Sequence, residues 1–273
     1  MMIEALANGN DTEISTVAKY AIKVAPQAAN AIQKLVDERR AAQQEAKQER
    51  LANADIFALW KVKAELGGFR STGSTNEFGI SANLSARREG LQWTHVLYGS
   101  TDYRRSNGRT STERFIASYA PRYRFDKRGF VYGLAQYEHD PFLGYDSRYS
   151  GSLGIGYKLI DTKRLNLSVD AGPSLRHILY VNDGIDDGTE TKLGARTSAD
   201  LEWKLSPTLT FRQTASGYAE KDVQSLTALS ALDTKLISVL TARFSYNLIY
   251  ETDNKLADRK LDTLSRVSLI YEF

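Results

Sequence analysis

Hydrophobic and polar side chains alternate with a period of two residues from Phe57 to Phe273. The final stretch, residues 266–273, shows the pattern most clearly, because its polar face is interrupted only by Ile270. The apolar face of that stretch carries Val267, Leu269, Tyr271 and Phe273. Alternate side chains of a strand point to opposite faces, so this pattern predicts strands with one apolar and one polar side.

Comparable runs recur along the chain, and turn signals separate them. The runs cover residues 60–66, 77–85, 114–125, 152–159, 165–176, 192–205 and 242–250. Short turns are expected at 88–90, 126–129, 160–163, 205–207 and 236–239, and longer loops at 105–108, 140–147, 182–190, 220–224 and 252–260. At roughly 18 residues per strand and turn, residues 57–273 accommodate about twelve strands. Short turns at one end and long loops at the other are typical of outer-membrane barrels.

The length and chemistry of the runs indicate which face points outward. Several runs exceed the ~10 residues that a tilted membrane-spanning strand needs, whereas strands of soluble proteins average ~5–6. The polar face also carries charges of both signs at mid-strand positions, such as Lys63, Glu65, Arg122 and Asp170. We therefore predict an all-β, antiparallel transmembrane β-barrel with its apolar side chains toward lipid and its charged side chains toward the lumen. A soluble ligand-binding barrel, in which the same pattern is turned inside out, is the less favoured alternative.

Residues 1–56 follow a helical pattern instead. Asp11 and Thr12 are suited to cap a helix, and Pro26 is suited to begin a second one. That second helix has a small apolar stripe at Ala29, Ile32, Leu35 and Val36, and from Asp37 onward it consists of strong helix formers with almost no stripe. An even number of strands places both chain ends at the short-turn, periplasmic end, so 1–56 is predicted to be a short helical periplasmic segment. It is interpreted as a solvated helix leading into the barrel, or as an arm that docks a periplasmic partner or another copy through residues 12–36.

Composition excludes several other classes. The mean hydropathy of −0.41 and the absence of a run of ~20 apolar residues exclude a helical membrane protein. The chain has no cysteine, so it has neither disulfides nor thiolate metal ligands. A net charge of +3, from 36 basic and 33 acidic residues, gives no electrostatic case for nucleic acid. Residues 1–7 lack the basic start and apolar core of an export signal, so an exported barrel requires that the numbered chain is processed or begins further upstream.

Three stretches resemble a known family. Residues 65–77 (Glu-Leu-Gly-Gly-Phe-Arg-Ser-Thr-Gly-Ser-Thr-Asn-Glu) are similar to the opening of domain-of-unknown-function family 481. Residues 146–148 with 154–157 are similar to its middle, and residues 245–247, Asp262 and the Phe273 end to its close. The family consists of proteins described as salt-induced outer-membrane proteins. The resemblance covers roughly 57–273 and implies a fold and a compartment, but no reaction.

The end of the chain also resembles the closing strand of bacterial outer-membrane barrels, which the assembly machinery reads. By that resemblance the assembly signal is carried by Val267, Leu269, Tyr271 and Phe273. The partners it implies are the barrel assembly machinery, outer-membrane lipids and lipopolysaccharide.

Candidate chemistry is sparse. His95, His139 and His177 are far apart in sequence, and His95 and His177 fall on predicted lipid-facing positions, as interfacial or structural histidines do. A lipid hydrolase of the outer-membrane type needs His, Ser and an orienting polar residue together, and His139 with Ser147 and Asp140 is the one loose candidate. The acidic loop 183–190 gathers carboxylates without the spacing of a calcium loop. We predict no catalytic residues, no metal site and no cofactor.

The remaining functional feature is an excess of basic residues on the predicted lumen face. It consists of Lys61, Lys63, Arg87, Arg114, Arg122, Arg124, Lys158, Arg176, Arg196, Arg212 and Arg243. The acids assigned to the same face are Glu65, Asp170, Asp200, Glu202, Asp233 and Glu272. We predict a non-enzymatic outer-membrane protein, either structural or a narrow, mildly anion-favouring channel. The alternative is an outer-membrane lipid-modifying enzyme.

Overall fold

The computed structural model describes residues 11–55, 57–71, 76–181, 188–221, 223–252 and 261–273. The chain forms two compact units, Met1–Ala58 and Leu59–Phe273, and each is described by itself.

The first unit is a pair of helices. Helix α2 covers Asp11–Val24, a single 3₁₀ turn covers Pro26–Ala28, and helix α3 covers Ala29–Ala52. Proline opens the short turn rather than the long helix, since α3 begins three residues later. A small core of Ile14, Ala18 and Val36, with Ile32 packed against it, joins the helices. Leu35 was expected in the apolar stripe but is 46% exposed and is not part of this core. No described helix is both long and apolar enough to cross a bilayer.

Replacing Val36 by aspartate is expected to separate α2 from α3 while leaving the barrel intact. Val36 is 2% exposed, so the substitution places a charge in the centre of the only described contact layer between these helices. Circular dichroism of the full chain should lose helical signal, and the heat-modifiable gel mobility of the barrel should remain. Lys34→Asp, at a solvent-exposed position of the same helix, is the matched control. Loss of barrel mobility in V36D would contradict the independence of the two units.

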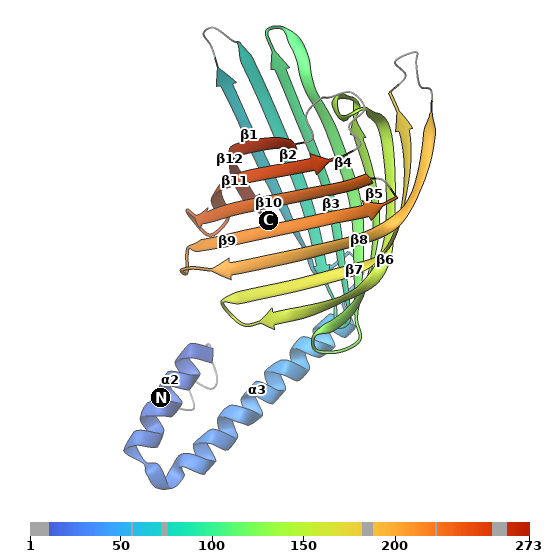
Figure 1. Cartoon of the computed structure of the whole chain (residues 1–273). Coiled ribbons are helices and arrows are strands. Elements are labelled where there is room, and N and C mark those ends of the chain that lie inside the picture. Colours follow the sequence, from blue (N-terminus) through green and yellow to red (C-terminus); the bar gives the residue numbers. More distant parts are fainter. Residues whose placement is uncertain (1–10, 56, 72–75, 182–187, 222, 253–260) are drawn as a thin grey trace. The chain divides into compact units, whose positions relative to one another are not determined.

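The second unit is a closed antiparallel barrel of twelve strands (Figure 1), as the sequence predicts. The strands are β1 (Trp60–Ser71), β2 (Glu77–Glu89), β3 (Trp93–Ser106), β4 (Arg109–Arg124), β5 (Gly129–Asp140), β6 (Tyr145–Asp161), β7 (Leu165–Tyr180), β8 (Thr189–Lys204), β9 (Leu209–Glu220), β10 (Val223–Lys235), β11 (Leu240–Glu251) and β12 (Leu261–Glu272). Each strand pairs with its neighbours in sequence, and β1 pairs with β12. The strands β9–β11 run across β2–β4 in Figure 1, because the tilted strands of opposite barrel walls cross.

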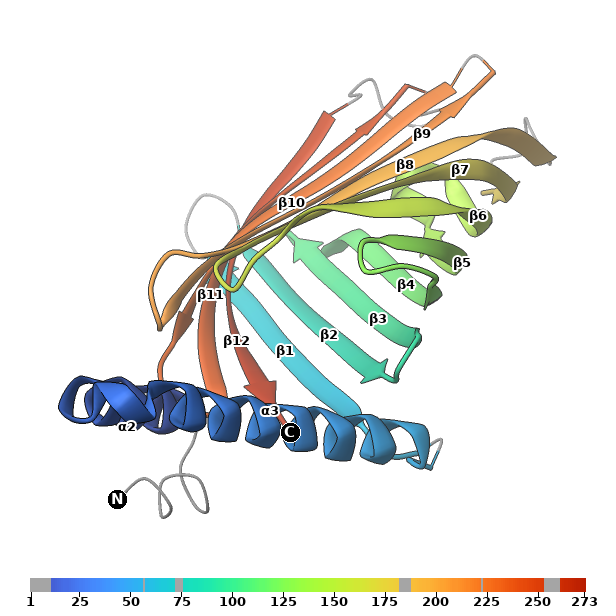
Figure 2. The ribbon, with the colours of Figure 1, turned by 90° about the horizontal axis from the view of Figure 1, so that it is seen from below.

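The connections differ at the two ends of the barrel. Turns of three or four residues follow β2, β4, β6, β8 and β10, and the end that carries them also holds the start of β1 and the end of β12 (Figure 2). At the opposite end the connections vary more than expected. Residues 105–108 were predicted to form a longer loop, but Asn107 and Gly108 form a two-residue turn with φ of 47° and 79°. Asn-Gly favours this tight hairpin because both residues tolerate positive φ. Likewise, β9 ends at Glu220 and β10 begins at Val223.

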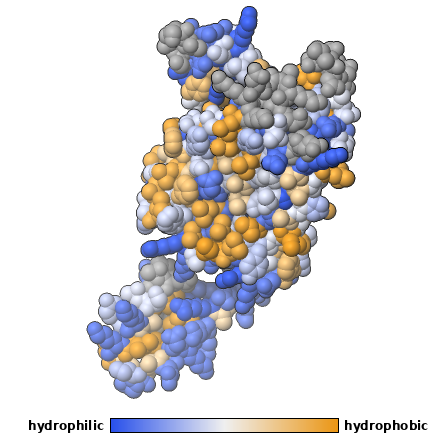
Figure 3. Space-filling model, in the orientation of Figure 1, coloured by the Kyte–Doolittle hydropathy of each residue, from blue (hydrophilic) through white to orange (hydrophobic). Residues whose placement is uncertain are grey.

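The barrel is apolar outside and polar inside. Leu153, Leu193 and Val267 are 70%, 76% and 68% exposed, and orange apolar side chains gather on the barrel surface in Figure 3. The buried side chains of the barrel are largely serines and charged residues that face the lumen, such as Ser100, Glu138, Asp170 and Arg176. This distribution contradicts a soluble ligand-binding barrel, which would bury the apolar face.

Outward-facing aromatic residues form two bands. Near the short-turn end they include Trp93, Tyr123, Tyr157, Trp203, Phe211 and Tyr271. Toward the other end they include Phe115, Tyr137 and Tyr149, whose rings pack at 6.1 and 5.2 Å. Aromatic girdles that flank an apolar band are the surface pattern of a membrane-spanning barrel, because these rings favour the lipid–water interface.

Candidate functional site in the barrel lumen

The predicted basic residues all lie on the inner face of the barrel, in two groups. The first group lies inside the lumen, away from the short-turn mouth, and its side chains are 2–38% exposed. It consists of Arg114, Arg122, Arg176, Arg196, Arg212 and Arg243. Lys61, Lys63, Arg87, Arg124 and Lys158 lie near the short-turn mouth, where four of them bond to local partners at the rim. Their proposed role in lining a pore stays a prediction.

An ion-pair cluster joins opposite walls toward the other end of the lumen. The Arg148 guanidinium donates through Nε to Glu138 and through Nη1 to Glu251, with both distances 2.7 Å. Arg114 binds Glu138 at 3.3 Å from the neighbouring strand β4, and Asp140 lies 3.6 Å from its Nε. Strands β6 and β11 lie nearly opposite each other in the ring, so the Arg148–Glu251 pair crosses the lumen. We name Arg114, Glu138, Asp140, Arg148 and Glu251 the outer cluster.

A second buried pair lies beside this cluster. Arg176 of β7 bonds Glu220 of β9 in a bidentate arrangement, with Nη2 2.6 Å from Oε2, and donates to Ser225 of β10. These side chains pass over Gly194 of the intervening strand β8, where a Cβ atom would lie 2.6 Å from the Glu220 side chain. Because Gly194 has no side chain, the Arg176–Glu220 pair can pass over β8 and join β7 to β9.

Further pairs lie on the inner face between the outer cluster and the short-turn mouth. Arg196 binds Asp170 at 2.7 Å, and Arg122 reaches from β4 to Asp200 of β8 at 3.2 Å. Inner-face rings lie against these guanidinium groups, Tyr132 against Arg196 and Phe130 against Arg122, at 5.5 and 5.2 Å. The resulting contacts again connect walls that are not neighbours in the sheet.

The half of the lumen nearer the short turns holds a third group. Arg243 of β11 binds Asp233 of β10 at 2.6 Å and Glu65 of β1 at 3.0 Å, and Arg212 of β9 binds Asp233 at 2.9 Å. The Ser268 hydroxyl donates to Glu65. These bonds run across the junction between the first and last strands of the barrel.

The inner face is therefore a lattice of ion pairs rather than a positive wall. The acids that the sequence prediction omitted include Glu89, Asp102, Glu138, Asp140, Glu220 and Glu251, and the omitted bases include Arg104, Arg148, Lys192 and Arg266. The two faces of residues 130–139 were not assigned from the sequence. With that assignment, the alternation of inner and outer residues would have predicted that Glu138 and Arg148 point into the lumen. The added acids remove much of the charge excess on which an anion preference was based.

The histidine-based hydrolase site is not assembled. His139 faces outward, with Nδ1 bonded to the backbone carbonyl oxygen of Asp146, whereas its neighbour Asp140 is buried on the inner face beside Arg114. The Ser147 hydroxyl donates to the Asp146 side chain. Adjacent residues of a strand point to opposite faces, so His139 and Asp140 cannot orient one another. His95 and His177 face outward, as predicted, and bond Tyr119 and Thr191.

No group of three or more metal-ligating side chains occurs among the described residues. The candidate calcium loop, 183–190, falls mostly outside the part of the chain that the structure describes.

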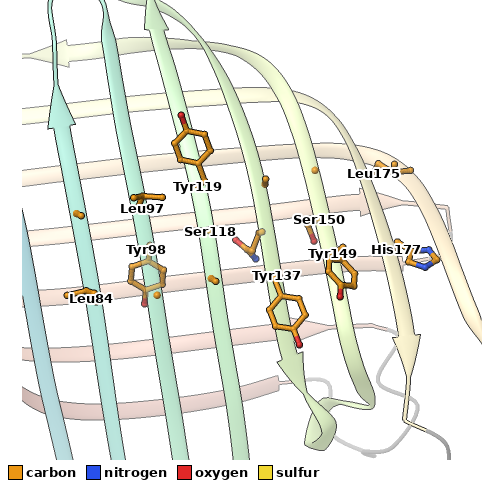
Figure 4. A pocket seen from close by; sticks show the side chains of 16 residues that line it. Leu84, Leu97, Tyr98, Ser118, Tyr119, Tyr137, Tyr149, Ser150, Leu175 and His177 are labelled. Atoms are coloured by element: carbon orange, nitrogen blue, oxygen red, sulfur yellow. The ribbon is translucent and has the colours of Figure 1, made fainter. Parts of the chain in front are cut away.

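A hollow lies on the outward surface over β2–β7 (Figure 4). Tyr119, Tyr137, Tyr149 and His177 project around it from neighbouring strands, and its floor consists of the small residues Gly99, Ala117, Ala135 and Gly151. Because it is almost wholly apolar and faces outward, it is suited to pack lipid chains rather than to perform chemistry.

The predicted assembly residues lie on the outer face of β12. Val267, Leu269, Tyr271 and Phe273 are each at least half exposed. The Phe273 backbone exchanges two hydrogen bonds with Val62 of β1, at 3.1 and 3.2 Å, and so extends the closure of the barrel by one residue. Recognition of this strand by other proteins stays a prediction.

A closed barrel with an apolar exterior, aromatic bands and a charged interior belongs to the class of membrane-spanning β-barrels of the outer-membrane type. Within that class the chain belongs to the family described as "Protein of unknown function, DUF481", whose model matches residues 64–273. This confirms the family resemblance identified from the sequence. A relative from Escherichia coli (strain K12), "Uncharacterized protein YdiY", is 22% identical over 206 residues, which cover 75% of this chain and 80% of the relative.

Several solved barrels are similar to this chain. The NanC porin is 13% identical with a TM-score of 0.47, covering 77% of this chain and 97% of the porin. The KdgM porin is 10% identical with a TM-score of 0.43, covering 78% and 99%. The translocator domain of the autotransporter NalP from Neisseria meningitidis is 16% identical with a TM-score of 0.42, covering 86% and 96%.

Proposed function

We propose that the protein is a non-enzymatic barrel of the bacterial outer membrane whose lumen is closed at rest by side-chain ion pairs. The observation that carries this proposal is the Arg148–Glu251 bond across the lumen, in which the two side chains are only 8% and 11% exposed. An open porin would keep such side chains hydrated along a continuous water-filled passage.

Three features of the lumen support closure. The cross-lumen bonds use arginine, whose planar guanidinium holds two carboxylates in a fixed geometry. Such bonds occur in the outer cluster and at Arg122–Asp200, and Arg243–Glu65 adds a further bond beside the junction of the first and last strands. A cavity of about 530 Å³, lined mainly by polar side chains, extends from the outer cluster to Arg243 and Glu65. The protein would therefore act as a structural envelope component unless a stimulus opens these pairs.

The placement of the two units belongs to the same proposal. Strand β1 begins at the short-turn end, which faces the periplasm in outer-membrane barrels, so residues 1–56 would lie in the periplasm. The barrel would contact outer-membrane lipids and lipopolysaccharide and would be inserted by the barrel assembly machinery. Residues 12–36 are the part of the helical unit that would dock a periplasmic partner.

Electrical recording tests closure directly. The purified, heat-modifiable full chain in a planar bilayer is expected to give no steady current, because the ion pairs block the passage. A steady current from a correctly folded barrel would overturn closure, and anion selectivity of that current would favour the narrow anion channel instead. Membrane fractionation of the producing bacterium tests the compartment independently.

A further inference from the structure

The barrel wall is incompletely paired where its first and last strands meet. Strands β1 and β12 pair from Lys63–Glu272 to Gly67–Ser268, and in the described residues their register stops there. By contrast, β1 pairs with β2 along its whole length, from Trp60–Arg88 to Ser71–Glu77. Strand β12 continues to pair with β11 as far as Leu261. Residues 68–71 and 264–267, which would face each other if the register continued, therefore have a described strand partner on one side only, and we call this stretch the open seam.

The open seam begins at Gly68 and Val267, where the neighbouring outer surface is apolar. Ile80, opposite Gly68 in the register, is 51% exposed, and Val267 is 68% exposed. Strand edges facing hydrocarbon are unfavourable, because lipid cannot satisfy backbone N–H and C=O groups. An occupant that shields this edge would remove that cost.

A cavity of about 290 Å³ lies at the open seam and is lined by residues from both faces of the wall. Its lining includes outward-facing Ile80 and Val267 and also inward-facing Phe69, Ser81, Asp102 and Arg266. Asp102, Leu264 and Arg266 line the lumen cavity as well, so the two cavities meet at these side chains. The seam cavity therefore adjoins the lumen on its inner side and the membrane-facing surface on its outer side, and the outer cluster does not line it.

The charges at the inner end of this cavity are predominantly positive. Its charged lining residues are Arg104, Arg266 and Asp102. Arg266 reaches from β12 over β1 and β2 to bond Asp102 of β3, and Gly67 leaves room for it, since a Cβ atom there would lie 3.0 Å from the Arg266 side chain. The Arg104 guanidinium lies over the Phe69 ring at 5.3 Å.

We propose that the open seam binds a single-chain anionic amphiphile, with its head group at Arg104 and Arg266 and its chain between Ile80 and Val267 in the bilayer. Two guanidinium groups against one carboxylate favour a negatively charged head group, which forms charge-assisted hydrogen bonds. The apolar outer rim accepts one alkyl chain. This inference rests on the membrane placement of the barrel but not on closure of the lumen.

Because the chain contains no cysteine, the seam itself can be tested by disulfide formation. Continuing the register places Arg70 opposite Ser265, and both positions share the outward face with the paired residues Leu66 and Leu269. L66C/L269C is expected to oxidise rapidly, whereas R70C/S265C is expected to oxidise at least tenfold more slowly. Equal rates would show a fully paired seam and overturn the proposal.

Binding is tested with hexadecanoate added to the full chain in phosphatidylcholine nanodiscs. The wild-type protein should bind hexadecanoate, and R104Q/R266Q should bind it at least tenfold more weakly. R124Q, which removes an inner-face arginine at the opposite end of the barrel, should bind normally. Hexadecanol, which lacks the charge, should bind wild type more weakly than hexadecanoate does.

Two results would overturn the inference: equal hexadecanoate binding by R104Q/R266Q and wild type, or equal wild-type binding of hexadecanol. Seam occupancy by a strand of another protein would appear as R70C or S265C cross-linking to that protein, and would also overturn it. Each variant is first checked for heat-modifiable mobility. A barrel that inserts but does not bind refutes only this inference, whereas failure of the wild type to insert refutes the proposed function.

Discussion

Replacing Arg148 by alanine is expected to convert a silent barrel into a conducting one and to destabilise it by about 3–5 kcal/mol. The Arg148 side chain links Glu138 to Glu251 by forming an ion pair with each of them. Only 8% of this side chain is exposed to solvent. Its removal leaves Glu251 without this partner and leaves Glu138 with Arg114 alone. Like charges then face one another across the lumen, and hydration of these carboxylates opens a path for water and ions. The current should favour cations, because the constriction becomes negative.

Planar-bilayer recording and urea titration of the folded fraction measure these two effects. Arg87→Ala is the matched control, since the Arg87–Glu89 pair is about half exposed at the short-turn mouth. Such a pair contributes ~0–1 kcal/mol, so the control should remain silent and nearly as stable as wild type. The exchange R148E/E251R should restore much of the closure. An R148A barrel that is silent and fully stable would show that the outer cluster does not close the lumen.

Deleting Phe273 is expected to reduce the folded, heat-modifiable barrel to a minor fraction of the wild-type amount. The paired part of the β1–β12 junction is short, and Phe273 adds to it two backbone hydrogen bonds with Val62. The deletion also removes an exposed aromatic side chain that packs on Tyr271 at 5.8 Å between ring centroids. Both losses affect the last step of closing the barrel.

Phe273→Ala separates the side chain from the backbone, because it keeps the two hydrogen bonds. If the side chain is read by the assembly machinery, F273A should assemble poorly in cells but refold normally in detergent without that machinery. The deletion should fail in both settings. Phe244→Ala, at a similarly exposed outward position on β11, is the control and should assemble normally. Normal cellular assembly of F273A would contradict the signal role of this side chain.

The fold was largely predictable from the sequence because a period of two residues is a local property. Runs such as 192–205 and 242–250 alternate with one exception each, Thr197 and Ile249, so both the strands and their outward faces could be assigned from the sequence. The turn at Asn107–Gly108 was missed, although this dipeptide is itself a hairpin signal, because polar flanking residues suggested a longer loop.

The interior could be predicted only in part. Alternation places Arg243 inside, but no local pattern shows that it bonds Glu65, which is 178 residues away in sequence. Such partners depend on the stagger of the strands, which decides the levels at which opposite walls meet. The open seam also depends on the stagger of the strands. The sequences of β1 and β12 each predict an ordinary strand and do not show how far the two strands pair.

The ties between non-adjacent strands have a mechanical consequence. Arg148–Glu251, Arg176–Glu220 and Arg266–Asp102 act as struts between strands that are not neighbours, so a load applied to one hairpin is shared by other strands. Under a pulling force the wall would therefore resist being peeled hairpin by hairpin and would yield when the struts break together. The same struts limit how far the cross-section can flatten as the surrounding bilayer bends or thins.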